Sequence, residues 1–189
     1  MSAQDQDPLI VKFTKVPVRL SYPSLFEAKA FGGGTDGAKP KFSAVFLLDK
    51  KRNAADIKAM QTAIAVAIRE GLKGKHPGTD KICLKDGSAK EDTDGYGPDV
   101  MFVSASSETR PGVVDKDLTP LVSADGKPYA GCYVYATIRL WAQDNKWGKR
   151  VNATLRNVQF VKDGEPFGEK RVAPEDEFDA IEDDGEDLT

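Results

Sequence analysis

Residues 131–141, GCYVYATIRLW, alternate with a period of two, which is typical of a β-strand. One parity is entirely apolar, and its members are Cys132, Val134, Ala136, Ile138 and Leu140. Because successive side chains of a strand point to opposite faces, this parity predicts a strand with one face in a core. The other parity carries aromatic rings and a cation, and these residues are Tyr133, Tyr135, Arg139 and Trp141. A fold for this chain must bury the first face and account for the rings on the second.

The rest of the pattern predicts mostly β-structure with a single helix. The stretches expected to form further strands are 9–22, with an interruption near Pro17, 42–48, 99–107, 110–114 and 151–161. A helix is expected to begin at Asn53, with Asp56 in a capping-box position. Its apolar stripe consists of Ile57, Met60, Ile64, Ile68 and Leu72. Five or so strands around one helix suit a small closed or partly open barrel better than a parallel α/β sheet.

The outer face of 131–141 has the composition of a surface that binds single-stranded nucleic acid. Exposed rings can stack on any base, and each stacked base is worth roughly 1–3 kcal/mol. The expected hairpin tip, 142–150, adds a tryptophan among positive charges, and the return strand places Arg156 on the parity of Phe160. The candidate DNA-binding residues are Tyr133, Tyr135, Arg139, Trp141, Lys146, Trp147, Lys149, Arg150 and Arg156, with Lys39 and Lys41 from a glycine-rich loop. The same rings could instead be core residues, and if the helix covers the tyrosines the binding surface shifts toward Trp147.

The net charge of −3 conceals two regions of opposite sign. Residues 174–189 contain nine acidic and no basic residues, which leaves 27 basic and 21 acidic residues in 1–173. The body is therefore +6 and the tail −9, which favours a polyanionic partner for the body and an interaction tail at the C-terminus. The tail residues expected to bind a partner or to cover the basic surface are Glu175, Asp176, Glu177, Phe178, Asp179, Glu182, Asp183, Asp184, Glu186 and Asp187.

The sequence offers little for catalysis or cofactor binding. A single histidine and two cysteines in different expected elements exclude a His/Cys zinc site. The stretch 32–37 has the glycine spacing of a phosphate-binding loop, but Ala38 replaces the required lysine and a strand follows. The acidic residues of 85–98 lack the spacing of a calcium loop, and no nucleophile pairs with a histidine. We therefore expect no enzyme activity, no metal and no cofactor.

The chain also lacks the signals of a membrane or secreted protein. No apolar run approaches the ~18 residues that a membrane helix needs. Its first residues, MSAQDQDPLIVKF, have neither the charged segment nor the apolar segment of a secretory signal. The cytoplasm is the expected compartment, with no membrane partner.

Several segments resemble a family of tailed-phage and prophage proteins long catalogued as a domain of unknown function, whose members bind single-stranded DNA. The segments are RLSYPSLFEAKA (19–30), PKFSAVFLLDK (40–50), DGYGPDVMFVSASS (94–107), RPGVVDKDLTPL (110–121), YAGCYVYATIRLWA (129–142) and NATLRNVQFVKDGEPFG (152–168). The resemblance implies a mainly β, OB-fold-like five-stranded barrel with one central helix, and an acidic C-terminal tail that recruits replication proteins and competes with DNA. Tails of this kind typically end in phenylalanine, whereas this one ends Leu188-Thr189.

The sequence thus predicts an OB-fold domain over 1–173 followed by a disordered acidic tail over 174–189. Its expected function is to coat single-stranded DNA without sequence preference during phage replication, recombination or repair. A second copy of the chain, in a homo-oligomer, is among its expected partners. Three alternatives stay open: a recombination mediator or strand-annealing protein, an RNA-binding OB protein, and a protein-interaction adaptor whose acidic tail mimics DNA.

Overall fold

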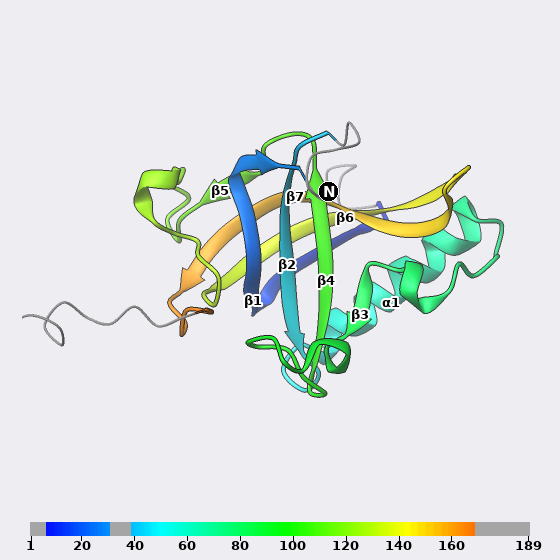
Figure 1. Cartoon of the computed structure of the whole chain (residues 1–189), viewed down its shortest axis with the longest axis horizontal. Helices are drawn as coiled ribbons and strands as arrows, with labels where there is room; N and C mark the ends of the chain where they lie inside the picture. Colours follow the sequence, from blue (N-terminus) through cyan, green and yellow to red (C-terminus); the bar gives the residue numbers. More distant parts are fainter. Residues whose placement is uncertain (1–6, 31–38, 169–189) are drawn as a thin grey trace, which may run out of the picture.

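The computed structural model describes residues 7–30 and 39–168 (Figure 1). In chain order the larger elements are β1 (Ile10–Lys29), β2 (Lys41–Asp49), α1 (Ala54–Gly71), β3 (Leu84–Asp86), β4 (Val100–Ser107), β5 (Gly112–Val114), β6 (Tyr133–Asn145) and β7 (Gly148–Lys162). Short 3₁₀ helices occur at Thr79–Lys81, Gly87–Lys90 and Ser123–Asp125. No helix within the described ranges is long and apolar enough to cross a bilayer.

Five strands close into a barrel, which confirms the predicted fold class. The hydrogen-bonded order is β3-β4-β2-β1-β6-β7-β5, and a further parallel pairing between β4 and β7 closes the ring. The barrel is therefore β1-β2-β4-β7-β6, while β3 and β5 are short flanking strands. The 20-residue β1 pairs with β6 through its first half and with β2 through its second half, so it bends across the barrel (Figure 1).

The predicted division of 131–141 into a buried and an outer parity is confirmed. Its five apolar members are all buried to at least 98%, and they join one core with Phe13 and Phe46, whose ring centroids lie 6.2 Å apart. The expected interruption near Pro17 is also present, because the β1–β6 register shifts between Phe13 and Val18. The hairpin loop is tighter than expected, since β6 continues to Asn145 and β7 starts at Gly148.

The prediction that Arg156 and Phe160 share a face is wrong. The register between β6 and β7 shifts after the pair Thr137–Asn157, and the next pair is Ile138–Leu155. An extra residue therefore bulges on β7 and reverses the alternation at that point. Phe160 is 4% exposed in the core, whereas Arg156 is half-buried on the outside.

The single helix, α1, packs against one end of the barrel (Figure 1). Its predicted stripe is confirmed, with Ile57, Met60, Ile64 and Leu72 buried and Ile68 partly buried. The capping box is wrong, because the Asn53 side chain makes no bond to a helix N–H; it donates to the Asp56 carboxylate (3.0 Å) and accepts from the Asp49 backbone N–H. Near its C-terminal end, Gly71 fits so closely against Ala142 of β6 that a Cβ there would lie 2.3 Å from the Ala142 Cβ. The helix thereby supports the β6–β7 hairpin at the end of β6 opposite Tyr133.

Candidate nucleic-acid interface

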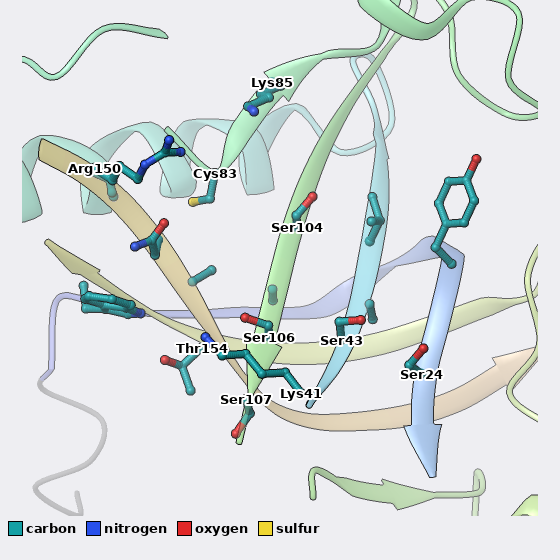
Figure 2. Close-up of a pocket in the computed structure, with 18 of the residues that line it drawn as sticks. Ser24, Lys41, Ser43, Cys83, Lys85, Ser104, Ser106, Ser107, Arg150 and Thr154 are labelled. Carbon is teal, nitrogen blue, oxygen red and sulfur yellow. The ribbon is translucent and has the colours of Figure 1, made fainter. Parts of the chain in front are cut away.

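An open groove of about 1130 Å³ runs over the barrel where β4 and β7 meet. Residues from β1, β2, β4, β6 and β7 line it, together with the segment 80–85 and Lys90. Figure 2 shows that Ser43, Ser104, Ser106 and Thr154 come from three neighbouring strands. The groove thus depends on barrel closure, since β2 and β7 are far apart in sequence.

The floor of the groove consists of small side chains. Ser43 pairs in register with Ser106, and Ser106 pairs with Thr154 across the closing strands, so three hydroxyl residues form a row over β2, β4 and β7. Between them the buried Ala44, Ala105 and Ala153 belong to the core. Because small hydroxyl side chains leave space and donate hydrogen bonds, the floor can receive an extended polar chain.

The groove walls carry a large excess of positive charge. Its cations are Lys29, Lys41, Lys81, Lys85, Lys90 and Arg150, and its acidic residues are Asp80 and Glu108. Lys81 lies 3.6 Å from the Asp80 carboxylate; within the described residues the other five cations form no ion pair. In Figure 2, Lys85, Arg150 and Lys41 lie at separate positions around the groove. Several cations without acidic partners, spread along one groove, are suited to successive phosphates.

Two aromatic rings in the groove wall are open to solvent. Tyr22 is 59% exposed and Trp141 is 39% exposed. Tyr22 has φ of +44°, in the left-handed region that side chains other than glycine rarely adopt, where the β1–β2 register shifts between Ser21 and Ser24. Backbone strain of this kind concentrates at functional sites. Lys90 lies 6.0 Å from the Tyr22 ring centroid, so a cation accompanies this ring.

Cys83 is the one thiol in the groove lining, and it faces the same space in Figure 2. Burial raises its pKa to about 12. The thiol is therefore neutral at physiological pH and does not reduce the positive charge of the groove.

The structure brings three of the predicted DNA-binding residues into this groove: Lys41, Trp141 and Arg150. Lys39 is exposed two residues before Lys41, at the edge of the described segment. The hairpin residues Lys146 and Trp147 are exposed beyond the groove, and Lys149 pairs with Asp144 at 2.8 Å. The acidic tail residues lie outside the described residues.

The other four predicted residues are not part of the groove lining. Tyr133 is half-buried, with the Arg19 guanidinium 5.8 Å and the Lys162 ammonium 4.8 Å from its ring centroid. Tyr135 is half-buried in the next outward position of β6. The Arg139 guanidinium donates a hydrogen bond to the Asp7 carboxylate at 2.8 Å. The pKa of Asp7 is lowered first by a hydrogen bond from the Leu9 backbone N–H and then by this bond from Arg139. Arg156 also lowers the Asp7 pKa through its charge, which places it near the same carboxylate.

The sequence patterns missed several groove residues. They are Tyr22, Lys29, Lys81, Lys85 and Lys90. One usable signal was present: Tyr22 precedes Pro23 within a strand pattern, and proline restricts the preceding residue and disrupts strand pairing. A second was the run of small residues SASS at 104–107, because strands with small outward side chains leave room for a ligand.

Comparisons with known proteins agree on one family. The model of the family described as "Enterobacter phage Enc34, ssDNA-binding protein" matches residues 10–189. Putative protein p50 of Acyrthosiphon pisum secondary endosymbiont phage 1 is 40% identical over 173 residues, covering 87% of this chain and 90% of that protein.

Solved structures support the same assignment. The single-stranded DNA-binding protein from bacteriophage Enc34, in complex with ssDNA, is 32% identical with a TM-score of 0.72, over 81% of this chain and 87% of that one. The single-stranded DNA binding protein gp2.5 of bacteriophage T7 shares the fold, with 15% identity and a TM-score of 0.51 over 81% of this chain and 91% of that one. The resemblance seen in the sequence is confirmed: this chain belongs to the family of the single-stranded DNA-binding protein of Enterobacter phage Enc34.

Proposed function

We propose that the protein binds single-stranded DNA without sequence preference and protects it during phage DNA replication, recombination or repair, in the cytoplasm of the host. One observation carries the proposal: a groove with six cations, two exposed rings and a floor of small hydroxyl side chains, in a family with a solved member in complex with ssDNA. The protein acts by binding alone and needs no cofactor for this role.

The chemistry of the groove favours single strands over duplexes. Lysine and arginine side chains neutralise phosphates of any sequence. Tyr22 and Trp141 offer flat faces to bases, and every base has a π-face available for stacking once it is unpaired. In a duplex the bases are already stacked on their neighbours, so the rings gain nothing unless the helix opens. Backbone contacts combined with stacking therefore select single strands and tolerate any sequence.

Titration of the protein with poly-dT, followed by tryptophan emission, tests this function directly. A base stacked on Trp141 is expected to quench the emission. Across a salt series, log affinity should fall linearly with log salt concentration, with a slope of about −0.7 per phosphate contacted. Unchanged emission together with no mobility shift in a gel would rule out the proposed function.

The acidic tail is proposed to cover the groove when DNA is absent and to recruit replication or recombination proteins when DNA displaces it. The proposal follows from the charges, −9 for 174–189 against +6 for the rest of the chain. Removing 174–189 is therefore expected to tighten single-strand binding about tenfold at low salt and to permit binding to duplex DNA.

A full-length variant with the nine tail carboxylates replaced by amides is the matched control, because it keeps the length and removes the charge. It should behave like the truncation if charge is the cause. Equal or weaker affinity in both variants would refute the proposed competition while leaving the binding function intact.

A further inference from the structure

The β6–β7 hairpin extends beyond the groove and carries a tryptophan at its tip. Its two-residue turn is Lys146-Trp147, and Trp147 is 74% exposed, the highest exposure of any large apolar side chain among the described residues. Figure 1 shows the hairpin reaching past the barrel beside the last turns of α1. Arg150, which lines the groove, lies three residues away, so at about 3.3 Å per residue the tip is roughly 10 Å beyond it.

Side-chain hydrogen bonds and an ion pair connect the two strands of the hairpin near this tip. Asn152 donates to Gln143 at 3.0 Å across the two strands, and Lys149 pairs with Asp144 at 2.8 Å. The Trp147 backbone N–H donates to the Asn145 side chain at 2.9 Å. The turn therefore presents the Trp147 ring to solvent, where its flat face can stack on another aromatic ring.

The two faces of the hairpin lead to different basic surfaces. Trp141 and Gln143 line the groove, whereas Ala142 lies against Gly71 at the end of α1. Asp144 lies on the same face of β6 as Ala142. The pKa of its carboxyl is lowered first by the hydrogen bond from Lys149 and then by the charges of Lys73 and Lys75. The hairpin therefore separates the groove from a second set of cations, Lys73 and Lys75, which follow α1. The Lys146 ammonium lies 5.0 Å from the centroid of the Trp147 ring, so a cation accompanies the ring at the tip.

We propose that this hairpin tip is a wedge for the junction between single-stranded and duplex DNA: Trp147 stacks on the last base pair, one strand enters the groove past Arg150, and the other follows Lys73 and Lys75. The inference rests on the proposed single-strand binding and assigns the hairpin tip a separate site, which acts on the duplex edge next to a bound strand. A ring that projects between two separate basic surfaces fits a site where two DNA strands diverge. A hairpin that only extended the path of a single strand would need cations on the groove side alone. Stacking on the terminal pair stabilises the open junction and blocks its closure.

A forked duplex tests the wedge. It carries a dT tail long enough to fill the groove, followed by a short duplex with a fluorophore and a quencher at the junction. With tail binding saturated, the full-length wild-type protein should open the junction. Trp147→Ala should reduce the opening equilibrium roughly five- to tenfold, since one stacking contact is lost, and Trp147→Phe should restore most of it. Exchanging Lys73 and Lys75 for glutamine should also reduce opening.

The affinity of each variant for poly-dT separates the wedge from the groove. Trp147→Ala is expected to bind poly-dT within about twofold of wild type, because the ring lies outside the groove. If this variant opens the junction as well as wild type does, or loses as much poly-dT affinity as junction opening, Trp147 is not a wedge. If wild type binds poly-dT but opens no junction, the wedge fails while the proposed function stands; if it does not bind poly-dT, the proposed function itself fails.

Discussion

Reversing the charge of two groove cations, Lys85→Glu together with Arg150→Glu, is expected to weaken binding to a dT oligonucleotide about 100-fold or more at low salt. The two residues come from different parts of the chain and lie at separate positions along the groove (Figure 2). Each now offers a positive charge with no ion-pair partner among the described residues. If each contacts one phosphate, the log–log salt dependence should become shallower by about 1.4, because single strands contribute about 0.7 per contact. Fluorescence titration at four or five salt concentrations measures both quantities.

A matched variant distinguishes groove contacts from overall charge. Arg52→Glu with Lys58→Glu changes the net charge by the same amount, and both positions are exposed and outside the groove lining. This variant should retain affinity within a few-fold and keep the wild-type salt slope. If both pairs weaken binding equally, the effect is long-range electrostatics, and the groove is not the path of the DNA.

The core of the barrel was predictable because the alternation of residue types along a strand indicates which side chains face the core. Val134, Ile138 and Leu140 are buried where the period of two placed them, and the helix stripe from Ile57 to Leu72 also faces the core. Such patterns depend only on which face of an element meets water. They fail where the backbone adds a residue, as the bulge near Arg156 shows, because a bulge leaves no clear sign in the sequence.

The groove could be predicted only in part, because it is assembled from distant segments. Trp141 and Arg150 were accessible to sequence reasoning, since they lie near each other on one hairpin next to a recognisable strand. Tyr22 reaches the groove through a bulge and a left-handed φ in β1, and Lys85 and Lys90 reach it from a flanking strand and a short 3₁₀ helix. Their placement depends on barrel closure, which pairs strands separated by about fifty residues of sequence.

The outer tyrosines show why an aromatic-rich strand face is ambiguous. Tyr133 shares its outward parity with Trp141, yet Arg19 and Lys162 lie on its ring, and Arg19 also donates to the Gly131 and Glu165 carbonyls. These contacts join the end of β7 to β1. A ring already in contact with two cations of its own chain has less surface to offer a base than Trp141 has. Both kinds of ring, one covered by cations and one open to solvent, lie on the same face of β6. The sequence pattern does not distinguish them, whereas the three-dimensional structure does.

Removing both groove rings, Tyr22→Ala with Trp141→Ala, is expected to weaken binding to dT oligonucleotides at least 30-fold, since each stacked base contributes roughly 1–3 kcal/mol. The salt slope should stay unchanged, because phosphate contacts remain, and this distinguishes the loss from that of the charge-reversal variant. Mobility shift or anisotropy must be the readout, since the variant lacks the reporting tryptophan. Tyr135→Ala is the matched control, as Tyr135 is an outward ring of β6 outside the groove lining, and it should bind within about twofold of wild type. If Tyr135→Ala lost as much affinity for dT oligonucleotides as the double variant, the groove rings would not be the main stacking site. The bases would then stack on the outer face of β6 near Tyr133, as the sequence alone predicted.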